Sequence, residues 1–155
     1  MTTIPNSWEE VTTRYQPLPW INQADFETNH MGLWRPPTEY NGWIVEWPFK
    51  EIYCNKEVMD DLTWIFVEII NQKVVDSIQT FDGCWCVRPI QGSASGRWSL
   101  HSFGIALDLN ATTNQLNTVG SMSPMIVNIF KYAGWTWGGD FSRKDPMHFQ
   151  RAHNC

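Results

Sequence analysis

Two short segments in the C-terminal half carry side chains that can bind a metal ion and move a proton. The segment 99–108, SLHSFGIALD, contains His101 and Asp108, and the segment 145–148, DPMH, contains Asp145 and His148. Zinc in hydrolases commonly takes three protein ligands from His, Asp and Glu, keeps a fourth position for water and works beside a carboxylate that moves a proton of that water. The two segments together contain the residue types that such a site needs.

The pattern around these residues predicts two strands that point them the same way. In the run 105–109, IALDL, apolar bulk alternates with small or charged side chains, so a strand would bury the isoleucine and leucines and turn Asp108 away from the core. The run 147–150, MHFQ, repeats this alternation and places His148 and Gln150 on the outer face. If the two strands are neighbours, Asp108 and His148 stand side by side.

Glycine and proline residues near the two segments predict how they are held. Gly104 allows the chain to turn before the first strand, and Pro146 stiffens the turn that follows Asp145. A carboxylate at 145 could then reach a metal-bound water without being a ligand. In the segment 135–140, WTWGGD, the glycine pair would let backbone approach a substrate closely, and Asp140 would orient a ligand histidine.

Taken singly, these patterns have an ordinary structural explanation. A histidine in a folded domain is more often a surface or core residue than a ligand, and a His-x6-Asp spacing occurs by chance. Two runs that both place polar groups on one strand face favour a zinc site more strongly. The residues alone leave both interpretations open.

Length and charge exclude several classes of partner. A chain of 155 residues predicts one domain with one core. The net charge of −5 and the lack of a Lys/Arg run argue against nucleic acid. The apolar runs, such as 64–67, are far shorter than the roughly 20 residues of a membrane span. Because the first residues lack a signal-peptide pattern, we expect a soluble chain made in the cytoplasm.

The cysteines and tryptophans are expected to be structural. Four cysteines, Cys54, Cys84, Cys86 and Cys155, are predicted to be free thiols in a reducing compartment. Cys84 and Cys86 would share a strand face, as in a metal-binding CxC, but without a second CxC or a nearby histidine burial in the core is favoured. The ten tryptophans are expected to fill the core, with a groove for sugar or peptide as the alternative.

The secondary-structure signals are strongest after residue 40. Residues 1 to about 30 show no sustained periodicity and are predicted to form either an arm that wraps the domain or a tail that orders on a partner. Asn41-Gly42 before an extended, aromatic run at 43–48 predicts a short hairpin. Asn55 is a candidate N-cap for a helix whose apolar stripe is formed by Val58, Leu62, Ile65 and Ile69.

Further signals complete the predicted fold. Asp82-Gly83 predicts a hairpin between strands at 77–81 and 84–87, and Ser123-Pro124 predicts a second helix that ends at Gly134. Helices and short strands without βαβ regularity indicate an α+β domain with a small, mostly antiparallel sheet.

Taken together, the motifs resemble a known family. Ser99-x-His101-x-x-Gly104-x-Ala106-x-Asp108, then WTWGGD at 135–140 and Asp145-x-Met-His148-Phe-Gln150, are similar to zinc D-alanyl-D-alanine carboxypeptidases of the VanY type. The branch that they resemble most is that of the L-alanyl-D-glutamate peptidases among phage endolysins. The segment 83–93, which contains Arg88, also looks like that branch, so the resemblance runs from about residue 44 to 152. Phe141 departs from a tryptophan that is frequent in the family.

The resemblance implies roles for individual residues. His101, Asp108 and His148 would bind Zn²⁺, and Asp145 would be the catalytic acid and base. Arg88 would hold the substrate or its developing oxyanion, while Ser99 and Trp137 would contact the substrate. The implied fold is that of hedgehog and D-Ala-D-Ala peptidases. We expect a catalytic domain at 44–155 and an N-terminal arm of uncertain role at 1–43, which together form a single compact domain.

Three functions remain open at this stage. The first is an endolysin-like, monomeric peptidase that cleaves the L-Ala-D-Glu bond of the peptidoglycan stem peptide and acts on the cell wall. The second is a D-Ala-D-Ala carboxypeptidase, which uses the same metal centre. The third is a non-catalytic module that binds the wall or builds a virion, although such a module would have no need to keep Asp145.

Overall fold

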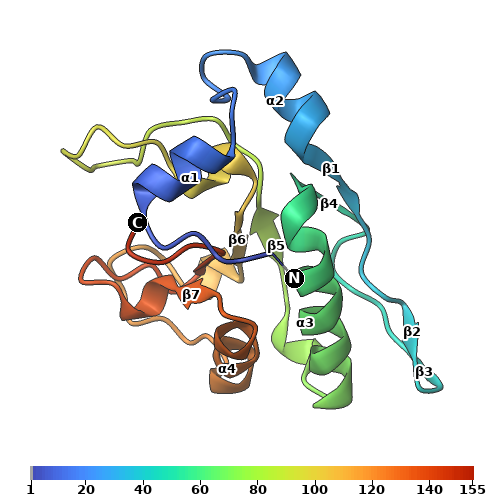
Figure 1. The fold of residues 1–155 in the computed structure, drawn as a ribbon. Helices are drawn as coiled ribbons and strands as arrows, with labels where there is room; N and C mark the ends of the chain where they lie inside the picture. Colours follow the sequence, from blue (N-terminus) through green and yellow to red (C-terminus); the bar gives the residue numbers. More distant parts are fainter. Residues whose placement is uncertain (1) are drawn as a thin grey trace.

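The computed structural model describes residues 2–155 and shows an α+β fold (Figure 1). The α-helices are α1 (Trp8–Arg14), α2 (Gln23–His30), α3 (Met59–Asn71) and α4 (Pro124–Tyr132). The strands are β1 (Met31–Trp34), β2 (Glu39–Tyr40), β3 (Trp43–Ile44), β4 (Ile52–Asn55), β5 (Phe81–Gly83), β6 (Ala106–Leu109), β7 (Thr136–Trp137) and β8 (His148–Gln150). Short 3-10 helices lie at η1 (Lys56–Val58), η2 (Val75–Ser77), η3 (Leu100–Phe103), η4 (Ala111–Thr113) and η5 (Gly138–Asp140).

The central sheet brings the two predicted strands together. Its order is β5-β6-β8-β7, and every neighbouring pair is antiparallel. Asp108 of β6 lies directly opposite His148 of β8. The predicted small antiparallel sheet and the predicted pairing of Asp108 with His148 are therefore confirmed. Two further pairs, β1-β4 and β2-β3, lie outside this sheet.

Helices α3 and α4 pack against each other and supply much of the core (Figure 1). The predicted stripe of α3 is buried, and Phe130 of α4 stacks on Phe149 of β8 with ring centroids 4.2 Å apart. Each such side chain contributes about 1.5–3 kcal/mol by leaving water. This burial fixes β8, and with it His148, against the helical layer.

The predicted ends of these helices are also confirmed. Asn55 caps η1, which leads directly into α3, by accepting a hydrogen bond from the Glu57 amide. Ser123 precedes Pro124 at the start of α4, and Gly134 follows its end with φ of +87°, a conformation that favours glycine. The hairpin predicted at Asn41-Gly42 is formed by β2 and β3.

The hairpin predicted around Asp82-Gly83 was wrong. These residues lie in β5, which pairs with β6 instead of folding back on the segment that follows it. Asn110 at the end of β6 accepts hydrogen bonds from the Gln79 and Thr80 amides, and Asp82 accepts one from the Ala111 amide. These long-range bonds hold β5 against β6, so the segment that follows β5 is not paired with it as a hairpin strand.

The N-terminal segment is more ordered than its weak periodicity indicated. Helices α1 and α2 bury Val11, Tyr15 and Phe26 in the same core as the rest of the chain. Ser7 caps α1 by accepting a hydrogen bond from the Glu10 amide. Helices α1 and α2 therefore pack onto the rest of the domain, as Figure 1 shows for α1.

The cysteines are free, and the tryptophans are mostly packed. Cys84 is buried whereas Cys86 is exposed, so the two do not share a face as predicted. Trp34 is buried and Trp47 packs on the core, but Trp43 is exposed at the β2-β3 hairpin. None of the helices described between residues 2 and 155 has the length and apolar character needed to cross a membrane.

Candidate metal centre

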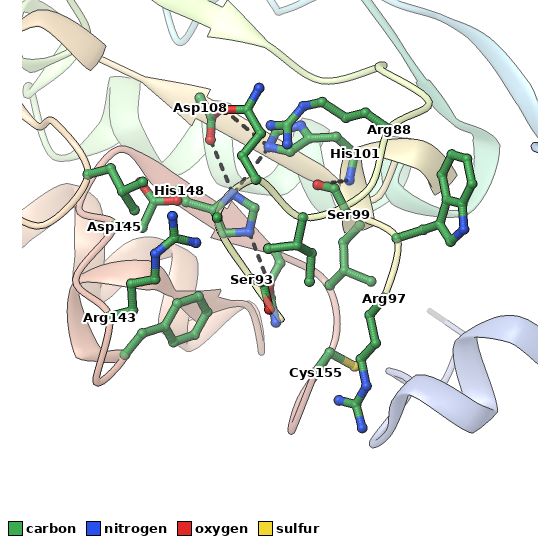
Figure 2. A pocket seen from close by; sticks show the side chains of 18 of the residues that line it. Arg88, Ser93, Arg97, Ser99, His101, Asp108, Arg143, Asp145, His148 and Cys155 are labelled. Carbon is green, nitrogen blue, oxygen red and sulfur yellow. Dashed lines mark hydrogen bonds and ion pairs between the residues drawn. The ribbon is translucent and has the colours of Figure 1, made fainter. Parts of the chain in front are cut away.

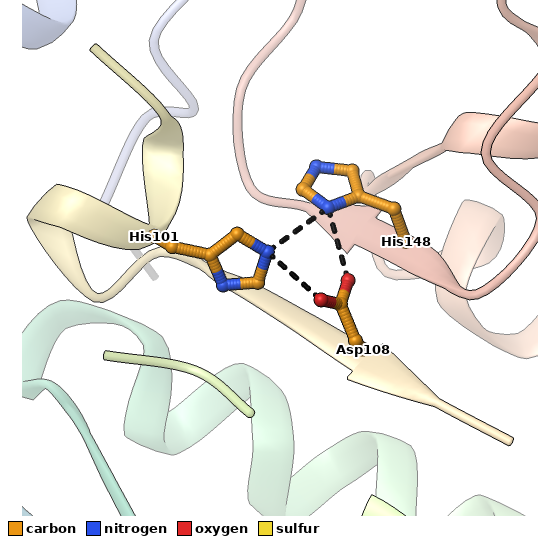
Figure 3. A group of neighbouring side chains, drawn as sticks. All are labelled: His101, Asp108 and His148. Carbon is orange, nitrogen blue, oxygen red and sulfur yellow. Dashed lines mark hydrogen bonds and ion pairs between the residues drawn. The ribbon is translucent and has the colours of Figure 1, made fainter. Parts of the chain in front are cut away.

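His101, Asp108 and His148 converge on one point (Figure 3). Nε2 of His101 lies 3.2 Å from Nδ1 of His148 and 3.3 Å from Oδ2 of Asp108. Oδ1 of Asp108 lies 3.2 Å from Nδ1 of His148. Each residue comes from a different element, η3, β6 and β8, so the cluster exists only in the folded chain.

These separations fit a metal ion. A tetrahedral zinc ion with bonds of about 2.0–2.1 Å places its ligand atoms about 3.3 Å apart. The three separations between facing donor atoms are within 0.1 Å of that spacing. Three protein ligands of the His, Asp, His type also leave one tetrahedral position for water, as catalytic sites do.

His101 is held by the chain on both sides of η3. Ser99 caps η3 by accepting a hydrogen bond from the His101 amide, and Gly104 ends it with φ of +66°. A Cβ at Gly104 would lie 2.9 Å from the Asn55 amide nitrogen, so only glycine fits there. Nδ1 of His101 donates to the Cys84 carbonyl over 2.9 Å, which leaves the Nε2 lone pair facing the cluster.

Gln150 fixes the ring of His148 in the corresponding way. The Gln150 amide nitrogen donates to the Ala152 carbonyl over 3.1 Å, so its oxygen is the atom that lies 3.0 Å from Nε2 of His148. An oxygen can only accept there, and Nε2 therefore carries the proton. The Nδ1 lone pair of His148 then points at Asp108 and His101, which is the tautomer that a metal ligand needs.

The charges of the cluster favour a bound cation. Burial alone would raise the pKa of Asp108, but without a metal the contacts of its carboxylate with protonated His101 and His148 outweigh burial and hold that pKa well below its usual range. Burial alone would lower the pKa of His148, whereas its contact with the Asp108 carboxylate raises it. A carboxylate that stays ionised beside two imidazoles is an electrostatically suitable cation site.

Asp145 lies beside the cluster on a tight turn. The His148 amide donates to the Asp145 carbonyl over 3.0 Å, and the Asp145 amide donates to the Gly138 carbonyl over 3.0 Å. A Cβ at Gly138 would collide with the Asp145 carbonyl oxygen. Gly138 therefore makes room for the backbone of this turn, and neither glycine of the pair lines the cavity, so the predicted role in approaching a substrate is corrected.

The electrostatic setting of Asp145 suits proton transfer. Burial raises the pKa of this carboxyl, and the Asp108 carboxylate raises it further, while the charge of His148 opposes the shift. A raised carboxyl pKa makes the group a better proton acceptor than an ordinary aspartate, as a general base needs to be. Asp145 lies outside the three-residue cluster, as expected for a residue that is not a ligand.

The cluster opens into a cavity of about 550 Å³ (Figure 2). Its walls include His101, Asp108, His148 and Asp145, and the predicted residues Arg88 and Ser99 are also among them. Ser102 fixes the wall that carries Arg88, because its hydroxyl lies 3.1 Å from the Arg88 carbonyl and 3.0 Å from the Arg88 amide. The three candidate metal ligands, the predicted base Asp145 and the predicted Arg88 therefore all line one cavity.

Two predicted residues lie elsewhere. Trp137 is not part of the cavity wall, and its indole donates to the Pro146 carbonyl over 2.8 Å behind the Asp145 turn. Asp140 is half exposed and forms an ion pair with Lys131, so it does not orient a ligand histidine. In the structure the two histidines are oriented by other groups: the Cys84 carbonyl holds His101, and Gln150 holds His148.

The sequence reasoning missed other cavity residues. Trp8 reaches the cavity from α1, while Arg97 and Arg143 reach it from loops. Phe141, the departure from the family pattern, lines the cavity with its ring centroid 6.2 Å from that of His148. The three newly placed residues lie outside the motifs that the sequence reasoning used, so no spacing pointed to them.

Comparison with known proteins bears on one segment of the chain. Residues 93–151 match the family model of D-alanyl-D-alanine carboxypeptidase. The matched segment contains all three cluster residues and Asp145, and it begins after Arg88. Comparison with curated proteins and with solved structures gives no significant match. The segment that carries the candidate metal cluster is therefore similar to the D-alanyl-D-alanine carboxypeptidase family.

Proposed function

We propose that this protein is a zinc-dependent peptidase that hydrolyses a bond in the stem peptide of bacterial peptidoglycan. The single observation that carries the proposal is the His101, Asp108, His148 cluster, with donor atoms at zinc spacing and Asp145 in the same cavity. The family match over residues 93–151 supports the same class of reaction. We propose the cell wall as its place of action and the L-Ala-D-Glu bond as its target, which the resemblance of its motifs supports.

The residues divide the work as follows. A zinc ion held by His101, Asp108 and His148 would polarise the scissile carbonyl and make a water molecule more acidic. Asp145 takes the proton of the attacking water and passes it to the leaving amine. Arg88 donates hydrogen bonds to the oxyanion that develops on the substrate carbonyl.

Replacement of Asp145 by alanine tests this division. The variant should bind zinc in the same stoichiometry as the parent, because Asp145 is not a ligand, but it should lose lysis of purified peptidoglycan. Full lysis by that variant would refute the assigned role.

The D-Ala-D-Ala carboxypeptidase remains a second candidate, because the matched family model carries that description. Mass spectrometry of digested muropeptides separates the two. Loss of a terminal D-Ala identifies the carboxypeptidase, whereas release of the stem peptide from L-Ala identifies the endopeptidase.

A further inference from the structure

The cavity holds more positive charge than the chain as a whole would suggest. Arg88, Arg97 and Arg143 all line it, in a protein whose net charge is −5. Guanidinium groups bind carboxylates through paired, parallel hydrogen bonds, which makes arginine well suited to recognise a substrate carboxylate. The three arginines lie at different parts of the wall and therefore face different parts of a bound substrate.

Arg143 combines a fixed backbone with an uncommitted side chain. The following residue, Lys144, anchors the loop, because its carbonyl accepts from the Asn117 amide and its Nζ donates to the Gly139 carbonyl over 2.9 Å. Within residues 2–155 the Arg143 guanidinium forms neither a hydrogen bond nor an ion pair. It lies against Gly92 of the opposite loop, where an added Cβ would be 3.1 Å from Nη2. Its donors are therefore available to a ligand in the cavity.

The position of Arg143 relates it to the leaving group. Figure 2 shows its guanidinium on the Asp145 side of His148, and its charge acts on the Asp145 carboxyl. Asp145 delivers its proton to the leaving amine, so the amino acid that carries this amine must lie on the same side. Any carboxylate on the α-carbon of that amino acid is two bonds from the amine nitrogen, on the side of the cavity that Arg143 lines.

Both candidate bonds present such a carboxylate. In the stem peptide D-Glu is linked onward through its γ-carboxyl, so its α-carboxylate is free next to the L-Ala-D-Glu bond. A terminal D-Ala also carries a free α-carboxylate next to the bond that a carboxypeptidase cleaves. We infer that Arg143 binds the free α-carboxylate of the D-amino acid on the amine side of the cleaved bond, an inference that rests on the proposed function.

The other two arginines are placed for different tasks. Arg97 lies beside Cys155 at another part of the wall, away from Asp145 in Figure 2. Arg88 belongs to the wall that Ser102 holds near His101, and its Nη1 makes a long contact of 3.4 Å with the Pro89 carbonyl. Arg143 is therefore the specificity-determining residue for the carboxylate, and Arg88 is left for the oxyanion.

Matched substrates test the inference without any mutation. We would measure kcat and KM on synthetic stem peptides in which the D-Glu α-carboxylate is free or amidated, and on D-Ala-D-Ala peptides ending in a carboxylate or an amide. The parent protein should prefer the free carboxylate by about 10-fold to 100-fold, because a hydrogen bond to a charged group contributes about 1.5–3 kcal/mol. Equal kcat/KM for the free-carboxylate and the amidated form of the peptide that is cleaved would overturn the inference.

Variants then assign the preference to one residue. In Arg143→Gln the preference should fall to about twofold or less, mainly through a higher KM for the free carboxylate, while cleavage of the amide persists. Arg143→Lys should be intermediate, because it keeps the charge but loses the paired donors. Arg35→Gln is the control: it removes an equal charge from an exposed side chain that pairs with Glu51 outside the cavity, and it should behave like the parent.

The outcomes separate the two claims. If the parent cleaves neither kind of peptide, the proposed function and the inference fall together. If the parent cleaves one but Arg143→Gln keeps the full preference, or Arg97→Gln removes it instead, only the inference about Arg143 falls.

Discussion

Replacement of Gln150 by leucine should weaken zinc binding although Gln150 touches no metal. Gln150 is 3 % exposed, and its side-chain oxygen fixes the proton on Nε2 of His148. Leucine has a similar size but cannot accept a hydrogen bond from the Nε2 proton of His148. The His148 ring would then lose the contact that holds its Nδ1 lone pair toward the cluster.

The size of the effect follows from the surrounding hydrogen bonds. The Ala152 carbonyl that Gln150 also contacts would remain paired, because the Thr136 hydroxyl donates to it over 2.9 Å. The loss therefore concentrates on His148, whose Nε2 proton would be buried without a partner. Loss of such an outer partner typically costs 10–100-fold in metal affinity, or about 1.4–2.7 kcal/mol.

Competition with a chromophoric chelator at fixed pH measures this change directly. The expected result is a zinc dissociation constant about 10–100-fold higher in Gln150→Leu, with far-UV circular dichroism unchanged. Gln72→Leu, at an exposed position after α3, is the matched control and should bind zinc like the parent. A folded Gln150→Leu variant with zinc affinity within about twofold of the parent would refute the tautomer argument.

Three further predictions concern the turn, the cluster and the core. Gly138→Ala should reduce peptidoglycan hydrolysis at least tenfold while zinc still binds, because the new methyl group displaces the backbone at Asp145; unchanged turnover would show that the turn tolerates it. Zinc affinity should fall as pH is lowered through neutrality, because the raised pKa of His148 lets protons compete with the metal at a higher pH than usual. Calorimetry in buffers of different ionisation enthalpy should detect the protons released on zinc binding. A pH-independent zinc affinity would contradict this prediction. Asp61→Ala should lower the free energy of unfolding by about 3–5 kcal/mol, because it leaves the charge of Arg151 buried without its partner. Urea unfolding measures this free energy, and a decrease below about 1 kcal/mol would contradict the prediction.

The part of the site that depends on local pattern could be predicted from the sequence. Alternation at 105–109 and 147–150 placed Asp108 and His148 on one face, and the observed register sets them directly opposite each other. Gly104 was also predicted as a turn residue, and its left-handed conformation confirms it. These features follow from the two-residue period of a strand and from glycine's freedom at positive φ.

The missed features depend on contacts between distant segments. The Asp82-Gly83 pair has a hairpin signal, but three side-chain hydrogen bonds that link the ends of β5 and β6 outweigh it, and all of them span about 30 residues. Helix α1 is too short to be stable alone and gains its stability from burial of Val11. Its cap, Ser7 with Glu10 three residues later, was the one local signal that could have revealed it.

The places of Arg143 and Trp137 show the same limit. Trp137 ends β7 and Arg143 lies in the loop between β7 and β8, and the fold of this segment depends on the contact of Gly138 with the Asp145 turn. No spacing in the sequence reports which residue of such a loop faces the cavity. The sequence therefore predicts the three cluster residues better than the other residues of the cavity wall.

The most direct test of the central claim is mass spectrometry of peptidoglycan digested by the purified protein, with and without a metal chelator. We predict that one stem-peptide bond is cleaved by the parent protein, that the chelator abolishes this cleavage and that added zinc restores it. Muropeptides left intact by the zinc-loaded protein, or cut equally well in the presence of the chelator, would contradict the proposal of a zinc-dependent peptidase.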